Sequence, residues 1–138
     1  MAVALTKFNS FVENLAQKGI DLSGAQITVA LVNSPAPTAS NSLLTELTQV
    51  SYTYCSTRVC TISGHAQSGG TFTWKITDLV LTASGGAVGP FQYVVLYDDG
   101  STGDMLIGFY NYGSSITLND GETLTINFDD TNGVLTIA

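Results

Sequence analysis

The spacing of apolar residues changes from a helical period to a strand period near the start of the chain. Phe8, Phe11, Val12 and Leu15 follow the i, i+3, i+4, i+7 spacing of an amphipathic helix, and a glycine follows them as a stop signal. This pattern predicts a short N-terminal helix over residues 6–18. Beyond it, apolar residues alternate with polar ones or form short β-branched runs, as strands do.

The first of these runs covers residues 26–32 and ends before two prolines, which predicts a strand followed by an exit loop. Ser42 then precedes Leu43, Leu44 and Leu47. A serine hydroxyl can accept hydrogen bonds from the unpaired amides at the start of a helix. We therefore expect a short helical turn there, capped by Ser42.

The remaining segments all have the composition of strands, and clusters of Gly and Asp separate them. They cover residues 50–54, 58–63, 71–76, 79–83, 91–97, 105–110, 122–128 and 134–137. Strands this short and this closely spaced are typical of a sandwich or barrel. With no internal repeat or linker, the sequence predicts one all-β domain over residues 1–138: an antiparallel β-sandwich, jelly-roll-like, with a short N-terminal helix.

The clearest turn signal lies at Leu118–Glu122, where Asn119 and Gly121 tolerate the positive φ angles of a tight turn. We expect a hairpin at this point. In the strand behind it, apolar residues alternate with polar ones, which suits a sheet packed on one face only. The apolar face carries Leu124, Ile126 and Phe128, and the polar face carries Thr123, Thr125 and Asn127.

Low charge sets this chain apart from an ordinary soluble domain. Only 11% of its 138 residues are charged and 44% are apolar, with a mean hydropathy of +0.26, whereas about 25% are charged in a typical domain. No apolar run is long enough for a membrane helix, and polar residues interrupt the N-terminal segment too early for a signal peptide. The composition therefore predicts a surface that is partly buried against other protein, and no membrane partner.

The few charges are distributed unevenly. The basic residues are Lys7, Lys18, Arg58 and Lys75, so residues 76–138 carry acidic side chains and no basic ones. A net charge of −7 with scattered cations argues against nucleic-acid binding, because phosphate backbones are held by clustered Lys and Arg. A basic protein partner remains open, as does a role of the asymmetry in orienting neighbouring copies.

Cys55 and Cys60 are five residues apart, which places them on opposite faces of one continuous strand. We therefore expect two free, partly buried thiols in a protein made in a reducing cytoplasm. A disulfide would need a tight loop between the two cysteines, and that alternative stays open.

His65 is the single histidine, so any histidine-dependent catalytic site must use it. It lies in Gly64–Gly70, a segment expected to be a flexible loop that would not hold a catalytic base in place. Zinc binding by Cys55, Cys60 and His65 is not expected either, because the spacing is wrong and a fourth ligand is missing. The sequence predicts no catalytic, cofactor-binding or metal-binding residues, and no enzyme.

Two glycine-containing segments resemble ligand-binding loops. Asp98–Asp104 places oxygen ligands around glycines as a calcium loop does, but it lacks the bidentate Glu of such loops, so a solvated turn is favoured and a weak cation site stays open. Gly85–Gly89 is followed by Pro90 where a phosphate loop would need a helix and a Lys. We expect a turn there.

Six aromatic residues at strand spacing permit two interpretations. They are Trp74, Tyr93, Tyr97, Phe109, Tyr110 and Tyr112. They could form a surface on which sugar rings stack. Aromatic residues at this spacing belong more often to a core or a subunit interface, and that interpretation is favoured.

Several stretches together resemble a group of small virion structural proteins of tailed bacteriophages. These stretches are Met1–Phe8, Leu81–Gly86, Gly89–Tyr97 and Leu106–Ser115, and the similarity continues through Leu118–Glu122 and Asn132–Ile137. It covers the N-terminal helix and nearly all of residues 79–138, and it is weakest over residues 38–70. The resemblance implies a virion component and brings no catalytic residues with it.

From the resemblance and the low charge we predict a capsid decoration or cement protein on the virion surface. Its partner would be the major capsid protein, at whose subunit junctions it would stabilise the shell, and it would form a homo-oligomer, with a trimer favoured at a threefold site. The alternative is a tail or fibre component that binds a host receptor or glycan. A small hydrolase dependent on His65 is the remaining rival.

Overall fold

The computed structural model describes residues 4–23, 26–129 and 131–138, and it is mostly β with one short α-helix. The helical elements are α1 (Ser10–Ala16) and the 3₁₀ helix η1 (Leu44–Glu46). The strands are β1 (Thr6–Lys7), β2 (Ile27–Val32), β3 (Ile62–Ser68), β4 (Thr71–Ile76), β5 (Leu79–Thr82), β6 (Val88–Asp98), β7 (Met105–Leu118), β8 (Thr123–Ile126) and β9 (Leu135–Ile137).

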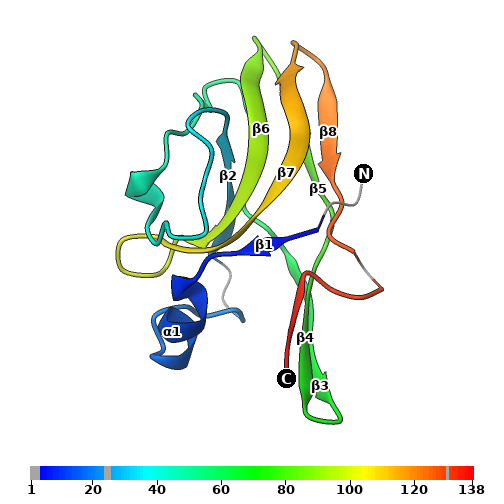
Figure 1. Cartoon of the computed structure of the whole chain (residues 1–138). Coiled ribbons are helices and arrows are strands. Elements are labelled where there is room, and N and C mark those ends of the chain that lie inside the picture. The colour runs from blue at the N-terminus through cyan, green and yellow to red at the C-terminus, as the bar shows by residue number, and fades with distance from the viewer. Residues whose placement is uncertain (1–3, 24–25, 130) are drawn as a thin grey trace.

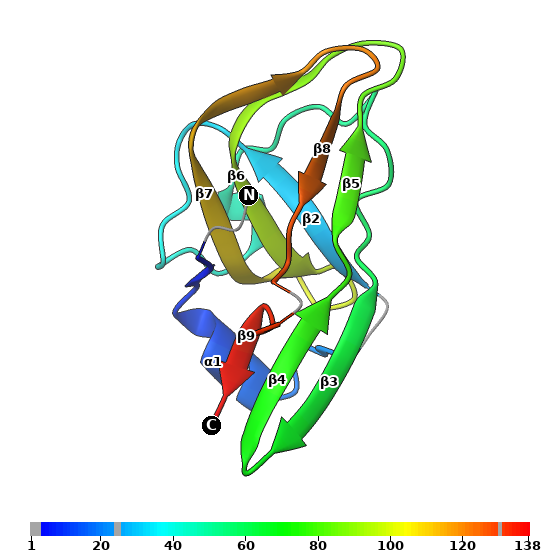
Figure 2. The ribbon, with the colours of Figure 1, turned by 90° about the vertical axis from the view of Figure 1, so that its right-hand side faces the viewer.

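Antiparallel sheets form two layers (Figures 1 and 2). One layer is a sheet with the strand order β1-β7-β6-β2, and the other consists of the pair β5-β8 and the sheet β3-β4-β9. This arrangement confirms the prediction of an all-β sandwich with one short helix. The jelly-roll description is not established by these pairings.

The strand pairs are nested within one another along the sequence. β6 and β7 form a hairpin, β5 before them pairs with β8 after them, and β4 pairs with β9 further out. β4 leads into β5 after two residues, and the loop 127–134 separates β8 from β9. The second layer is therefore a long twisted ribbon whose two halves are β4-β9 and β5-β8 (Figure 2).

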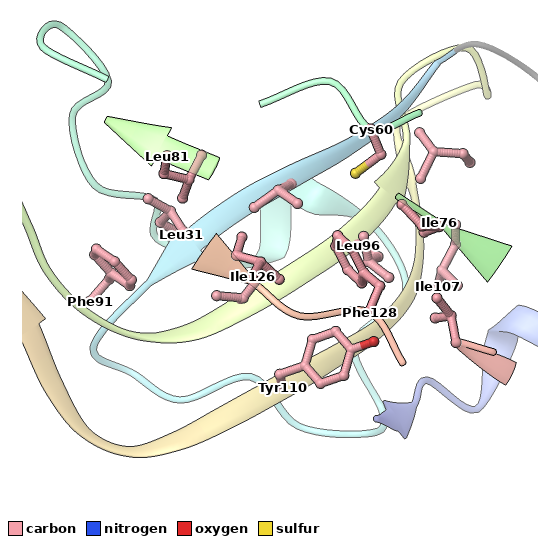
Figure 3. Packing of buried hydrophobic residues seen from close by; sticks show 14 of the residues in the cluster. Leu31, Cys60, Ile76, Leu81, Phe91, Leu96, Ile107, Tyr110, Ile126 and Phe128 are labelled. Atoms are coloured by element: carbon pink, nitrogen blue, oxygen red, sulfur yellow. The ribbon is translucent and has the colours of Figure 1, made fainter. Parts of the chain in front are cut away.

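The main core lies between the two layers (Figure 3). Leu31, Leu96 and Ile107 from the four-stranded sheet face Ile126 and Leu81 from the pair β5-β8, and all five are fully buried. This packing explains the alternation seen from residue 123 onward: Ile126 is buried in the core while Thr125 and Asn127 on either side of it are exposed.

A second cluster covers the opposite face of the four-stranded sheet. Phe8, Val32, Val95 and Leu106 are buried there, together with Leu44 of η1. Because both faces of β2 are covered, all six of its residues are buried. Burial on both faces is the reason that this strand reads as a continuous apolar run rather than an alternating one.

The N-terminal helix is shorter than predicted. Residues 6 and 7 form β1 and pair with Phe109 and Gly108 of β7, so the helix α1 begins only at Ser10. Phe8 packs in the second cluster whereas Phe11 packs in the main core, so the two rings do not share one helical face. The prediction of residues 6–18 was wrong at its start because Thr6 and Lys7 pair with β7, and it extended two residues beyond the observed end at Ala16.

Of two further predicted strands, residues 50–54 form no regular strand, and residues 58–63 do so only at Ile62 and Ser63, where β3 begins. Residues 55–59 pair first with the edge of β5, through the bridge from Cys55 to Ala83, and then with the edge of β2, through the bridge from Val59 to Thr28. The backbone hydrogen bonds of this segment are divided between two sheets, so its β-branched residues do not form a single ladder. The predicted strands at 26–32, 71–76, 79–83, 91–97, 105–110, 122–128 and 134–137 correspond to β2 and β4 to β9.

The predicted hairpin at Leu118–Glu122 is a turn, but the strands that it joins do not pair. The amide of Glu122 donates to the carbonyl of Asn119 at 2.9 Å, which closes the turn. β7 pairs with β6 while β8 pairs with β5, so the turn carries the chain from one layer to the other. Local sequence defines the turn, and packing between the layers selects the strand partners.

Ser42 does not cap η1 in the predicted way. The carboxylate of Glu46 accepts hydrogen bonds from the amides of Ser42 and Leu43, at 3.0 and 2.8 Å, and from the Ser42 hydroxyl at 2.9 Å. Ser42 is therefore a donor to the cap rather than the acceptor. The carboxylate is preferred because a charged acceptor makes the stronger hydrogen bonds.

Candidate functional surface

The three strands β3, β4 and β9 form a projecting sheet, which we call the arm (residues 62–76 and 135–137). The end of its β3-β4 hairpin extends beyond the rest of the chain (Figures 1 and 2). Lys75 is the only Lys, Arg, Asp or Glu within the arm, in a chain of net charge −7. The arm is therefore the least acidic part of an acidic molecule.

The hairpin that forms the arm is closed by a two-residue turn. Gly69 and Gly70 have φ angles of 59° and 86°, and Ser68 and Thr71 pair on either side of them. Positive φ at both central residues is the geometry of a type I′ turn, which joins twisted strands without splaying them and which favours glycine. The Gly-Gly pair therefore sets the register of β3 against β4.

Trp74 anchors the base of the arm to the body of the molecule. Its side chain is fully buried in the main core, and its indole Nε1 donates to the carbonyl of Leu22 at 2.9 Å. Leu22 belongs to the connection between α1 and β2. The arm thus has a fixed base, whereas the residues near the turn, Gln67–Gly70, are exposed.

The outer face of the arm carries small and hydroxyl side chains around a shallow hollow of about 600 Å³. Its lining comes from β3 residues 63–68, Thr73, Lys75, Thr131 and Asn132. Asn132 donates to the Asp129 carboxylate through its backbone and side chain, and these bonds lower the pKa of Asp129, with a smaller contribution from the Lys75 charge. The hollow is polar and contains no fixed constellation of reactive groups.

Among the described strands, β3 has the longest regular edge without a partner. The outer edge of β2 is covered by residues 49–50 and 58–60. The free edge of β7 beyond β1 is interrupted near Gly113, which has a φ of 84° and lies where the register shifts. β9 has only three residues. β8 also has no partner strand on its outer side, but it is only four residues long. β3 has five consecutive residues, 64–68, in regular pairing with a free side, which is the longest such edge among the described strands.

His65 lies in a strand, not in the flexible loop predicted for Gly64–Gly70. It pairs with Trp74 in the β3-β4 ladder, and only the two glycines at 69 and 70 form the connection. The flanking glycine at 64 suggested a loop, but that residue lies beside the stem of Lys75, where a Cβ would be 3.7 Å from the lysine Cβ. His65 is exposed on the arm.

Both cysteines are free thiols, as predicted. Cys60 is buried in the main core, and burial raises the pKa of its thiol to about 12. Cys55 is half-buried, and burial also raises the pKa of its thiol, opposed by the nearby Arg58 charge. Both thiols are thus kept protonated, which is unfavourable for nucleophilic chemistry.

Asp98–Asp104 forms the turn between β6 and β7, as the favoured interpretation predicted. The Asp98 carboxylate accepts hydrogen bonds from the amides of Asp21 and Gly100, each at 2.9 Å, so both of its oxygens organise backbone. Burial raises the pKa of Asp104, and the charges of Asp99 and Asp98 raise it further. Gly85–Gly89 connects β5 to β6 as a bend that enters the strand, in agreement with the predicted turn.

The aromatic residues do not form the exposed stacking platform that was considered. Trp74, Tyr97, Phe109 and Tyr110 are buried, in agreement with the favoured core interpretation. Tyr97 packs against Arg58, whose guanidinium also lies 3.6 Å from the centre of the Tyr52 ring and donates to the carbonyl of Val29 at 2.6 Å. These contacts hold the segment around Arg58, which covers the outer edge of β2, against that strand.

Within residues 4–23, 26–129 and 131–138, no group of three His, Cys, Asp or Glu side chains is placed to hold a metal ion. No helix in the same residues has the length and apolar character needed to cross a membrane. Of the strands of the arm, the sequence predicted β4 at 71–76 and β9 at 134–137, but it missed β3 beyond residue 63. The signal that could have found β3 is the Gly-Gly pair, which is a strong two-residue hairpin signal.

Comparison with known proteins finds no matching family model, no matching curated protein and no matching solved structure. The resemblance to virion proteins of tailed phages therefore stays a prediction from the sequence.

Proposed function

We propose that this chain is a structural protein of a bacteriophage virion, a capsid decoration protein that binds at junctions between major capsid subunits and stabilises the shell. The observation that carries the proposal is the arm. A projecting sheet with one charged side chain and an unpaired strand edge is suited to contact other protein, because such an edge is a template for pairing with another chain.

Two further observations support this function. The chain as a whole has 11% charged residues, which favours burial of its surface against protein. The sequence stretches that resemble phage virion proteins include Gly89–Tyr97 and Leu106–Ser115, which form most of β6 and β7 at the centre of the four-stranded sheet. The resemblance therefore lies in the scaffold and in β9, and the β3-β4 hairpin of the arm lies outside it.

The mechanism is thermodynamic linkage. A protein that binds the closed shell and not the opened one stabilises the closed state by RT ln(1 + [L]/Kd) for each site. Many copies bound across subunit junctions would add to the work needed to open the shell. Copies at threefold sites would be arranged as trimers, because a symmetric site favours a symmetric ligand.

The copy number of this chain relative to the major capsid protein tests the proposal. We expect a ratio near one, or near a simple fraction set by the threefold sites, when purified particles are measured by quantitative mass spectrometry. A few copies per particle would place the chain in a tail or fibre instead, and its absence from particles would overturn the virion role. Shells that lack the chain should burst at a lower temperature than complete shells.

A further inference from the structure

The unpaired edge of β3 is a template for another strand. We infer that it is a self-association edge, at which β3 of one copy pairs antiparallel with β3 of a second copy and joins two arms into one continuous sheet. This inference does not rest on the virion role, because it concerns the chain alone in solution, where a twofold dimer is the alternative to the trimer proposed for threefold sites of the shell.

The backbone groups available at this edge follow from the turn. In a two-residue hairpin the residues that flank the turn, here Ser68 and Thr71, form a hydrogen-bonded pair, and such pairs alternate along the ladder. Ala66 and Gly64 are therefore bonded to β4. His65 and Gln67 lie at the positions between them, so their backbone N–H and C=O groups point away from β4 towards the free side.

One register satisfies all of these outward groups. If the twofold axis passes beside Ala66, His65 of one copy lies opposite Gln67 of the other, and the reverse pair forms by symmetry. In each copy, the backbone N–H groups of His65 and Gln67 then donate hydrogen bonds to the second copy, and their carbonyl groups accept hydrogen bonds from it. A register centred on His65 would place two imidazoles opposite each other and would bring Gln67 to the irregular start of β3, where the ladder shifts between Ile62 and Gly64.

The side chains of β3 permit this approach. Natural edge strands are protected by Lys, Pro, inward-pointing charges or bulges. Residues 64–68 read Gly-His-Ala-Gln-Ser and contain neither proline nor a charged Lys, Arg, Asp or Glu. On the outer face Ala66 would meet only Ala66 of the second copy, so the two backbones can come close without a clash.

The distribution of charge favours a second copy at the arm rather than elsewhere. Two molecules of net charge −7 repel each other, and the repulsion is least where acidic groups are absent and where the bodies are held apart. The arm has no acidic residue and projects from the body (Figures 1 and 2). Pairing through β3 therefore joins two copies at the least acidic part of each and keeps the acidic remainders apart.

Sedimentation equilibrium of the wild type and two lysine variants tests the inference. The wild type should be a dimer at high protein concentration. Ala66→Lys should weaken the dimer roughly fivefold or more, because two ammonium groups would lie directly opposite each other. Thr125→Lys, on the exposed face of β8 and away from the arm, makes the same change of charge and should not weaken it.

Two further variants keep the test independent of charge. His65→Pro removes an outward N–H that has no partner within the chain, so the fold should persist while the dimer weakens. Ala66→Cys in a Cys55→Ser background should oxidise to a cross-linked dimer, because directly opposed residues of this kind have Cα atoms about 4.5 Å apart, within disulfide range. Circular dichroism and urea unfolding would confirm that each variant is folded.

A wild type that stays monomeric up to millimolar concentration would overturn the inference. So would a dimer that neither Ala66→Lys nor His65→Pro weakens, or a Thr125→Cys control that cross-links as readily as Ala66→Cys. A cross-link specific to Ala66, together with loss of the dimer in both arm variants, would establish the β3 edge and its register.

Discussion

At the scale of single residues, Gly133 and Gly121 show two different uses of glycine. Both have positive φ angles, 84° and 87°. A Cβ at Gly133 would lie 2.8 Å from the carbonyl oxygen of Trp74 and 2.7 Å from the methyl group of Thr73, whereas a Cβ at Gly121 would meet nothing within 4 Å. Gly133 therefore permits the loop before β9 to approach β4 closely, and Gly121 serves only the conformation of its turn.

Comparing alanine variants of these two glycines separates the cost of the backbone conformation from the cost of a steric clash. Gly121→Ala should lower the free energy of unfolding by about 1–2 kcal/mol, the cost of a left-handed conformation for an L-residue. Gly133→Ala should lower it by at least about 1 kcal/mol more, because the methyl group also forces β4 and the loop apart. Urea unfolding of both variants measures the difference. Equal decreases in the free energy of unfolding would show that the close approach to Trp74 adds nothing to the cost.

At the scale of elements, η1 depends on a single carboxylate. Hydrogen bonds from the amides of Leu43 and Ser42, and then from the Ser42 hydroxyl, lower the pKa of Glu46 from 4.5 to about 2. Because the folded-state pKa lies below the ordinary value, the stability that this carboxylate contributes is fully present above about pH 4.5 and is lost as the pH falls through about 2.

Removing this charge should have a pH-dependent cost. Glu46→Gln should be less stable than the wild type by about 1 kcal/mol at pH 7, the usual value of a helix cap. The gap should close as the pH falls from about 4.5 towards 2, because the wild-type carboxyl becomes protonated. Ser42→Ala, which removes one donor and leaves both amides, should cost less at pH 7. Thermal unfolding across this pH range tests the prediction, and a gap that is constant with pH would contradict it.

Sequence patterns predicted the strands well where the local spacing of apolar residues was sufficient to define them. β4 matches its predicted bounds of 71–76, and the prediction of β2 at 26–32 differs from its observed start by one residue. The predictions failed where long-range pairing decided the outcome. Thr6 and Lys7 are drawn into β1 by β7, and Val59 pairs with β2 although its local sequence suggested a strand of its own. No local pattern contains that information.

The candidate surface was predictable only in part. Low charge over the whole chain indicated contact with other protein, but the place of one acid-free segment in a projecting sheet could be found only from the topology. Gly64 and His65 appeared to belong to a loop, because glycine is rare inside strands. Their place in β3 becomes evident only from pairing with Lys75 and Trp74.

At the scale of the whole molecule, the charge distribution predicts how salt acts on self-association. Two copies joined by uncharged strands gain nothing from ion pairs, while their net charges of −7 oppose each other. The screening length falls from about 10 Å at 0.1 M salt to about 3 Å at 1 M, so added salt reduces the repulsion.

The dimer should therefore tighten as sodium chloride is raised from low to high concentration, as measured by sedimentation equilibrium at neutral pH. An interface held by salt bridges would show the opposite trend. A dissociation constant that rises with salt would thus contradict pairing through the arm. Ala66→Lys provides a second check, because added salt should restore part of the association that this variant loses.

The nesting of strand pairs also determines the order in which the sheets can form during synthesis. β3-β4 and β6-β7 are joined by short turns and can form as soon as their residues are made, whereas β4 obtains its second neighbour only from residues 135–137. During synthesis the arm is thus a two-stranded ribbon, which is only marginally stable in water. Nascent chains therefore present a poorly ordered edge to one another. The edge of β3 becomes a stable template for pairing only when β9 has joined β4.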